Sequence, residues 1–275
     1  MRAFVHTLDE RSERLRALGA EVVQGDLLDL HTVRATLEGI DRAFFAYPVQ
    51  DGLLDATASF AAGAREAGTE MVVNLSQLLT RPGDQPTSHQ RRHWLSEQVF
   101  DWADVGAVHL NATVFYENLR ALAGGTLAKA GAVMLPWGPE STPIPMVSAE
   151  DVASVAAAVL TGPAMPGGTV LPLVGDVVTN QDIVDAFSDL LGRPVPYREI
   201  SDEQWVQNIS GAGINDTAVE HLVQLWRFLR TRSPDHEHNQ VTDTIARITG
   251  NEPVSLHQFL DAHRQAFAGA LQPTL

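Results

Sequence analysis

The sequence predicts an α/β protein built on a Rossmann-like, doubly wound parallel sheet, with a smaller and mostly helical C-terminal lobe. Short apolar segments bounded by turn residues alternate with helical segments through the first half of the chain. From about Gly131 this alternation gives way to short extended pieces rich in proline and glycine, and then to a helical tail. We therefore expect a Rossmann-like core over residues 1–130 and a return segment with a second lobe over residues 131–275.

The strands and helices of the core follow from this pattern. The apolar segments predict strands at 2–7, 21–25, 41–47, 70–76 and 106–114. Helices are expected between and after them, at 10–18, 30–38, 53–67, 89–103 and 116–129. A further helix at 149–160 begins at Ser148 and carries Glu150 and Asp151 in its first turn, where the helix dipole favours acidic residues. The remaining expected elements are a strand at 169–174, a helix at 179–190 and a mostly helical tail over 201–270.

The strand and glycine loop that usually open such a fold have no counterpart in the sequence. Folds of this kind hold a cofactor pyrophosphate on a G-x-G-x-x-G loop after their first strand. In the first hundred residues Gly19, Gly25 and Gly39 each stand alone. The central first strand is therefore predicted to be missing, which leaves three alternatives: a longer natural protein, a strand supplied by another chain, or a sheet that has closed up and lost its cofactor. We favour the first, and expect weak or absent dinucleotide binding by the chain as given.

Composition excludes several classes of function. The 19 basic and 34 acidic residues give a formal net charge of −15, which disfavours binding to nucleic acid or to anionic membranes. Without cysteine, the chain has no disulfide, thiolate nucleophile or cysteine zinc site. His236 and His238 lie in an acidic loop without matched ligands elsewhere, so no metal site is predicted. No apolar run approaches the ~18 residues of a membrane span, which favours a soluble cytoplasmic protein.

Two familiar catalytic motifs are absent. Lys129 is the only lysine, and none of the three tyrosines is followed four residues later by lysine. The Tyr-x-x-x-Lys pair of many short-chain dehydrogenases is therefore missing. No G-x-S-x-G motif is present either, which argues against an α/β-hydrolase.

Polar and aromatic residues gather where the predicted strands end, which is the edge at which parallel sheets bind ligands. These tips are His6-Thr7, Ala46-Tyr47-Pro48, Asn74-Leu75-Ser76 and Thr113 to Phe115. Asp26, after the second strand, has the placement of a carboxylate that hydrogen-bonds an adenine amino group. A turn or helix-cap aspartate is the alternative for Asp26.

His93 and Glu97 are the candidate catalytic pair. Their spacing of four residues places them on one face of the helix predicted at 89–103. A histidine near a substrate carbonyl can donate a proton, and a carboxylate can orient that histidine. An exposed helix with ordinary charge pairs is the alternative.

Together these segments resemble the NmrA-like group of atypical short-chain dehydrogenase relatives. The resemblance rests on seven stretches: RLRALGAEVVQGDLLD at 14–29, EGIDRAFFAYP at 38–48, AREAG at 64–68, VVNLS at 72–76, HWLSE at 93–97, FYENL at 115–119, and PMVSAED at 145–151. It implies a Rossmann domain with a smaller C-terminal lobe that binds NADP(H) or NAD(H). Some members reduce quinones, azo dyes or triphenylmethane dyes, and others act as redox sensors through partner proteins.

The resemblance also implies roles for named residues. His6 and Thr7 would meet the adenosine ribose or its 2′-phosphate, Asp26 and Leu27 would flank adenine, and Tyr47 and Pro48 would line the pyrophosphate and ribose. Asn74 and Ser76 would approach the nicotinamide ribose, with Phe115, Glu117 and Asn118 closing the nicotinamide pocket. An arginine often found where His6 stands is missing, which leaves the choice between NADP and NAD open.

Two functions follow as expectations. The first is an NAD(P)H-dependent reductase of quinone-like or aromatic small molecules, with His93 or solvent delivering the proton. The alternative is a dinucleotide sensor without turnover that acts through a protein partner. A homodimer is compatible with either function.

Overall fold

The computed structural model describes residues 1–78, 87–210 and 213–267. The elements of the first half lie within about two residues of the predicted ranges in most cases. In chain order they are β1 (Arg2–Val5), α1 (Glu10–Ala17), β2 (Glu21–Gln24), α2 (Leu30–Leu37), β3 (Arg42–Phe45), α3 (Leu53–Ala67), β4 (Met71–Gln77), α4 (Ser88–Ala103), β5 (Val108–Ala112) and β6 (Val114–Phe115).

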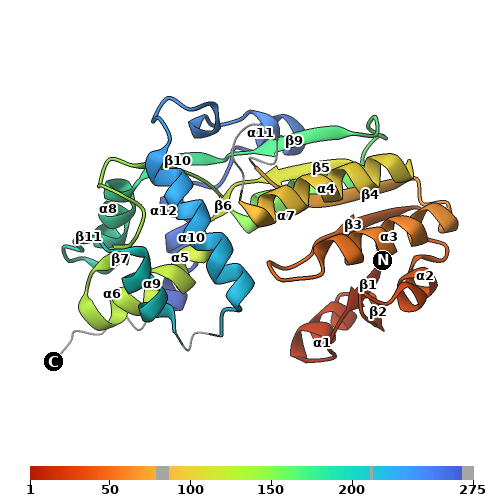
Figure 1. The fold of residues 1–275 in the computed structure, drawn as a ribbon, viewed down its shortest axis with the longest axis horizontal. Coiled ribbons are helices and arrows are strands. Elements are labelled where there is room, and N and C mark those ends of the chain that lie inside the picture. The colour runs from red at the N-terminus through yellow and green to blue at the C-terminus, as the bar shows by residue number, and fades with distance from the viewer. Residues whose placement is uncertain (79–86, 211–212, 268–275) are drawn as a thin grey trace.

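The main sheet is parallel and has the strand order β3-β4-β5-β9, where β9 is Thr169–Leu173. Apolar side chains of α2, α3 and α4 pack with Phe45 and Val72 on one face of the sheet. On the other face, α7 (Ala149–Thr161) and α11 (Thr244–Thr249) pack against Met71, Val73 and Leu110. Helices therefore cover both faces of a parallel sheet, which confirms the predicted α/β class (Figure 1).

β1 and β2 form a separate parallel pair. In Figure 1 this pair and α1 lie at the lower right, next to β3. Among the described residues neither strand pairs with the four-stranded sheet, and a cavity of about 740 Å³ is lined by β3 and by Arg2, Ala3 and Phe4 of β1. The missing central strand stays a prediction.

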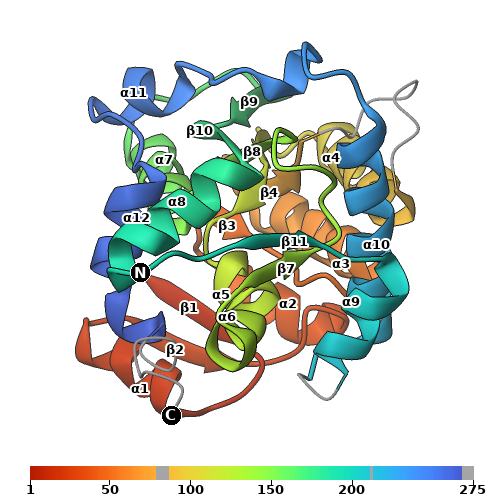
Figure 2. The same ribbon diagram turned by 90° about the vertical axis from the view of Figure 1, so that its left-hand side faces the viewer.

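The second lobe combines two small sheets with helices (Figures 1 and 2). One sheet has the order β10-β8-β6, and the other pairs β11 with β7. The elements are α5 (Asn118–Leu122), α6 (Gly124–Ala130), β7 (Val133–Leu135), β8 (Pro143–Val147), β10 (Asp176–Thr179), α8 (Asn180–Leu191), β11 (Tyr197–Glu199), α9 (Asp202–Ile209), α10 (Asp216–Thr231) and α12 (Leu256–Ala262). Two short 3-10 helices, η1 (Glu237–Asn239) and η2 (Arg264–Phe267), belong to the same tail.

Two predicted elements are divided in the structure. The strand predicted at 106–114 ends at Ala112, and the chain then enters β6, which pairs with β8 instead of continuing in the main sheet. Thr113 fixes this change by donating its hydroxyl to the Pro145 carbonyl at 2.8 Å. The helix predicted at 116–129 is interrupted at Ala123, just before the Gly124-Gly125 pair, and becomes α5 and α6.

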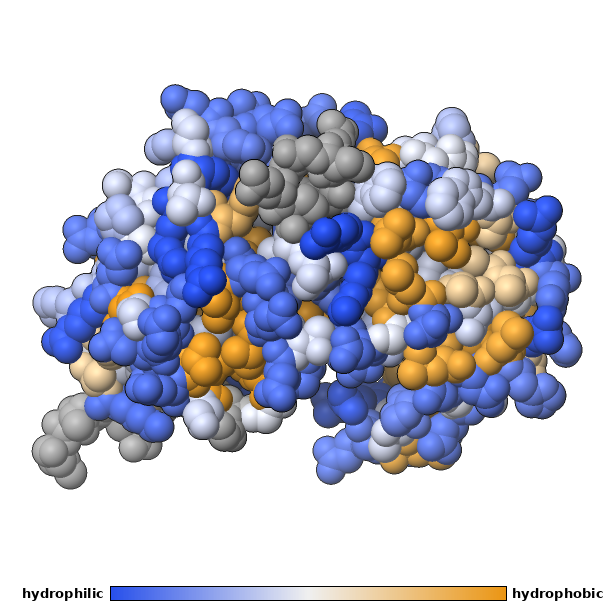
Figure 3. Space-filling model, in the orientation of Figure 1, coloured by the Kyte–Doolittle hydropathy of each residue, from blue (hydrophilic) through white to orange (hydrophobic). Residues whose placement is uncertain are grey.

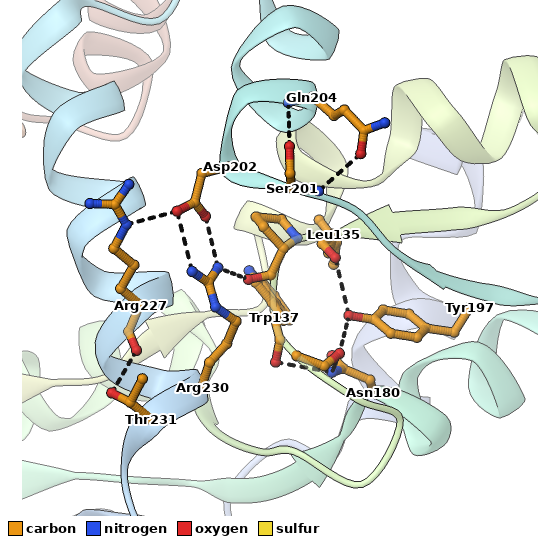
Figure 4. Close-up of polar contacts among 12 residues, drawn as sticks. Leu135, Trp137, Asn180, Tyr197, Ser201, Asp202, Gln204, Arg227, Arg230 and Thr231 are labelled. Carbon is orange, nitrogen blue, oxygen red and sulfur yellow. Dashed lines mark hydrogen bonds and ion pairs between the residues drawn. The ribbon is translucent and has the colours of Figure 1, made fainter.

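A polar network joins α9 and α10 to the segment that follows β7 (Figure 4). Asp202 accepts from Arg230 Nη1 at 2.7 Å and from Arg227 Nε at 2.8 Å. Arg230 also donates to the Pro136 carbonyl, and the Tyr197 hydroxyl donates to the carbonyls of Leu135 and Gly138. These contacts hold α10 in place.

Replacing Asp202 by alanine is expected to destabilise the protein by about 2–3 kcal/mol, because Arg230 would lose its carboxylate partner in a poorly solvated position. The Asp202 side chain is 11% exposed and that of Arg230 is 22% exposed. Glu66→Ala is the control, since its pair with Arg34 has side chains about half exposed and should contribute less than about 1 kcal/mol. Urea unfolding of both variants measures the difference, and equal losses would contradict this account.

The surface in Figure 3 is mostly hydrophilic, with hydrophobic residues gathered over part of the right-hand half and in a smaller area on the left-hand lobe. Within the described ranges, no helix combines the length and apolar character needed to cross a bilayer.

Candidate functional site

A pocket of about 290 Å³ lies where the ends of β3, β4 and β5 meet α4 and α10. The residues that follow or end these strands form its floor, which places the pocket at the edge where parallel sheets bind ligands. Its lining comes from Tyr47, Pro48, Val49, Leu75, Ser76, Gln77, Leu78, Gln90, His93, Ala112, Thr113, Val114, Phe115, Asn118, Pro145, His221, Leu222, Leu225, Leu229 and Arg232. We call this the sheet-edge pocket.

Helix α10 supplies one wall of the sheet-edge pocket. Leu222, Leu225 and Leu229 recur at helical spacing, so one face of the helix presents leucines to the cavity. The Asp202 network described above holds the same helix against the second lobe. The pocket wall is therefore mostly apolar and suits a planar, uncharged ring.

Hydrogen bonds to neighbouring residues hold the polar side chains of the pocket in place. The Ser76 hydroxyl donates to Glu97 Oε1, which joins the end of β4 to α4. Gln90 donates to the Leu78 carbonyl at 3.2 Å and forms a capping box with Thr87 at the start of α4. The Thr87 hydroxyl lies 2.9 Å from His221 Nδ1, which ties α4 to α10.

Three buried histidines meet at the pocket: His93 and His221 line it, and His89 lies behind them. The His89 ring centroid lies 4.9 Å from that of His93 and 5.0 Å from that of His221. Burial, reinforced by the other two histidines, holds the pKa of His93 well below its usual value. Burial lowers the pKa of His89 to about 4, with a contribution from Arg92, and that of His221 to about 3, with a contribution from His89. All three are neutral at pH 7.

The structure brings six of the predicted site residues together at the sheet-edge pocket. They are Tyr47, Pro48, Ser76, His93, Phe115 and Asn118. Glu97 lies one helical turn after His93, is buried, and is held by Ser76.

The other predicted residues lie elsewhere. Asn74 is buried on β4 and its amide is 3.1 Å from His109 Nδ1, whose Nε2 is 3.1 Å from Asp101. Glu117 accepts from the backbone N–H of Ala149 at the start of α7 and lines a different cavity, of about 320 Å³.

The four residues predicted to meet adenosine lie at the end of the β1–β2 pair. His6 Nε2 is 3.9 Å from Asp26 Oδ2, and Thr7 Oγ1 is 3.4 Å from His6 Nδ1. Leu27 is half-buried and packs against the core that α2 and α3 form. His6, Thr7 and Asp26 thus cluster, and none of the four lines the sheet-edge pocket.

Sequence reasoning did not single out His221 or Arg232, although both line the pocket. Their place depends on how α10 packs against the sheet edge, and the predicted helical tail carried no signal for that packing. The spacing of Leu222, Leu225 and Leu229 is typical of a buried helix face and does not by itself point to a pocket.

The nicotinamide end of a dinucleotide cofactor fits the residues of this pocket. Tyr47 and Phe115 offer aromatic surface, and Ser76 and Asn118 offer polar groups, in a pocket that suits the nicotinamide ring. The helix starts after β1 and β2 suit the pyrophosphate poorly. Asp9 and Asp29 cap α1 and α2 there, and their carboxylates accept from the first-turn N–H groups.

Comparisons with known proteins identify the family and the fold. A model described as the NmrA-like family matches residues 1–259. An NAD(P)H azoreductase of Xenophilus azovorans is 27% identical over 263 residues, covering 94% of this chain and 88% of that protein. A (4-alkanoyl-5-oxo-2,5-dihydrofuran-3-yl)methyl phosphate reductase of Streptomyces griseus is 27% identical over 266 residues, covering 96% and 91%.

A solved structure shows the same fold. The triphenylmethane reductase of Citrobacter sp. complexed with NADP(H) superposes with a TM-score of 0.79 at 17% identity, covering 95% of this chain and 89% of that one.

Proposed function

Since the chain belongs to the NmrA-like family, whose fold binds NAD(P), we propose that it is an NAD(P)H-dependent reductase of quinone-like or aromatic small molecules. The observation that carries this proposal is the sheet-edge pocket, a mostly apolar cavity with aromatic groups and two neutral histidines, His93 and His221, at the ends of three parallel strands. Both curated relatives are reductases, and the azoreductase uses NAD(P)H, which supports the same reaction type here.

The bound cofactor would supply the hydride, and the residues of this chain would position its nicotinamide ring and the substrate. Tyr47, Ser76, Phe115 and Asn118 would hold the ring. The leucines of α10 would cover the substrate and exclude water from it.

His93 would hydrogen-bond the substrate oxygen or nitrogen on which negative charge develops. Its depressed pKa keeps the imidazole neutral at pH 7, so this ring is suited to donate a hydrogen bond. The proton itself would then come from solvent. Glu97 would act through Ser76, by holding that hydroxyl in place at the end of β4.

The experiment that tests the proposal measures oxidation of NADPH and NADH with 1,4-naphthoquinone, followed by loss of the reduced cofactor's near-ultraviolet absorbance. Leu225→Trp fills the sheet-edge pocket from the α10 side and is expected to lower kcat/KM at least about tenfold. Glu220→Trp adds the same side chain at an exposed position of α10 and should keep the rate of the unmodified protein.

Equal rates in the two tryptophan variants would show that turnover does not use this pocket. Saturable cofactor binding with no oxidation of NAD(P)H by quinones or azo dyes would contradict the reductase and favour the sensor alternative.

A further inference from the structure

Arg232 lines the sheet-edge pocket, and among the described residues no carboxylate pairs with its guanidinium. It follows α10 as the C-terminal cap residue and lines the cavity together with Leu229. Its Nη2 donates to Asn239 Oδ1, and its guanidinium lies 5.4 Å from the centre of the Phe228 ring. Its Nε and Nη1 are buried and have no hydrogen-bond partner in the part of the chain that the structure describes.

The arginines within α10, Arg227 and Arg230, have carboxylate partners. Arg230, two residues earlier, is paired with Asp202 and donates to the Pro136 carbonyl. Arg227 also pairs with Asp202 and is largely exposed. Both charges are therefore compensated by a carboxylate, whereas the Arg232 guanidinium meets an amide oxygen and an aromatic ring.

An uncompensated, poorly solvated guanidinium is unfavourable for stability. Burial lowers the pKa of Arg232 to about 10, so the side chain still carries its charge at neutral pH. A group of this kind is expected where a ligand brings the missing negative charge, because two parallel N–H donors match a carboxylate, sulfonate or phosphate.

We propose that Arg232 anchors an anionic group of the substrate, so that the sheet-edge pocket takes aromatic molecules carrying a carboxylate, sulfonate or phosphate. The inference rests on the proposed function, which supplies the reaction that such a substrate would undergo. The anion subsite itself rests on the contacts of Arg232. Within the described ranges its side chain makes one hydrogen bond, to Asn239, and no ion pair, so an incoming anion would displace no carboxylate of these residues.

A single aromatic anion can occupy the apolar part of the pocket and contact Arg232 at the same time. Leu225 and Leu229 lie within two helical turns of Arg232 on the same helix, and Phe115 faces the same cavity. The ring of an aromatic anion would lie among these side chains while its charged group meets the guanidinium. Neutral aromatic molecules would contact these apolar side chains but would not bind the guanidinium.

The test uses benzenesulfonate and its neutral analogue benzenesulfonamide as probes, titrated calorimetrically against the protein without cofactor. Benzenesulfonate is expected to bind at least about tenfold more tightly than benzenesulfonamide, as a charge-assisted contact at a desolvated site requires. Arg232→Gln should abolish that preference. Arg227→Gln is the matched control on the same helix and should keep it.

Stability gives a second readout. Because Arg232 pairs with no carboxylate in the part of the chain that the structure describes, Arg232→Gln should have a Tm no lower than that of the unmodified protein, and benzenesulfonate should raise the Tm of the unmodified protein alone. A markedly lower Tm in Arg232→Gln would assign the arginine a structural role and overturn the proposal. Arg232→Lys, which keeps the charge but loses the paired donors, should retain part of the preference.

Equal affinity of the unmodified protein for the two probes, or the absence of binding by benzenesulfonate, would also overturn the proposal. A cofactor phosphate is the other possible source of an anion, so NADPH is titrated against the same variants. A loss of NADPH affinity in Arg232→Gln with no change in probe preference would assign Arg232 to the cofactor. Turnover of neutral 1,4-naphthoquinone is measured separately. An absence of turnover would contradict the proposed reaction but not the anion subsite.

Discussion

Replacing His93 by alanine is expected to lower kcat for quinone reduction about a hundredfold while KM changes little. Loss of one hydrogen-bond donor at a developing oxyanion has effects of about this size. His93 lines the sheet-edge pocket, whereas His89, one turn earlier on α4, lies behind it. Steady-state kinetics of His93→Ala and of the control His89→Leu measure the difference.

The pH profile distinguishes hydrogen bonding from proton donation by His93. Its pKa is depressed, so the ring stays neutral from pH 6 to pH 8. An imidazolium acid with the usual pKa of about 6.5 would lose activity as the pH rises through that value. We expect no such loss, and a rate that falls with rising pH in the unmodified protein but not in His93→Ala would contradict the assigned role.

Acidification from pH 7 to pH 5 is expected to lower the free energy of unfolding by up to about 2 kcal/mol for each of the three clustered histidines. Their native pKa values are depressed, to about 4 for His89 and about 3 for His221. The unfolded chain therefore takes up protons below about pH 6.5, where the folded protein does not. Stability is fully present above that pH and is lost as the pH falls toward the native values.

His89→Leu tests this acid sensitivity. Both ring nitrogens of His89 lack a hydrogen-bond partner among the described residues, so an apolar residue of similar size should be tolerated at pH 7. Urea unfolding at pH 7, 6 and 5 should show a fall in stability that is smaller in the variant by about the contribution of one histidine. Parallel curves for the two proteins would show that His89 does not carry this contribution.

The fold of the core could be predicted from the sequence because its signals are local. Alternating apolar segments, with Ser148 as the expected start of the helix at 149–160, predicted ranges close to those observed for α2 and α7. Non-local pairing was harder to anticipate. β6 leaves the main sheet to pair with β8, and the proline-rich residues 143–147 form the central strand of a second sheet.

The candidate site could be predicted in part for the same reason. Tyr47, Ser76 and Phe115 were found because the ends of parallel strands converge at one edge. The wall made by α10 was missed, since His221 and Arg232 reach the pocket through helix packing that leaves no local pattern. Asn74 was placed at the site by its strand-end position, but it lies in the sheet interior, where its amide meets His109.

The measurement that tests the central claim most directly is saturation-transfer difference NMR of NADPH in the presence of the protein. The claim is that the sheet-edge pocket receives the nicotinamide ring against Tyr47 and Phe115. We predict strong saturation of the nicotinamide protons, lost in Leu225→Trp and kept in Glu220→Trp. Saturation confined to the adenine protons, or nicotinamide saturation that is unchanged in Leu225→Trp, would contradict the claim.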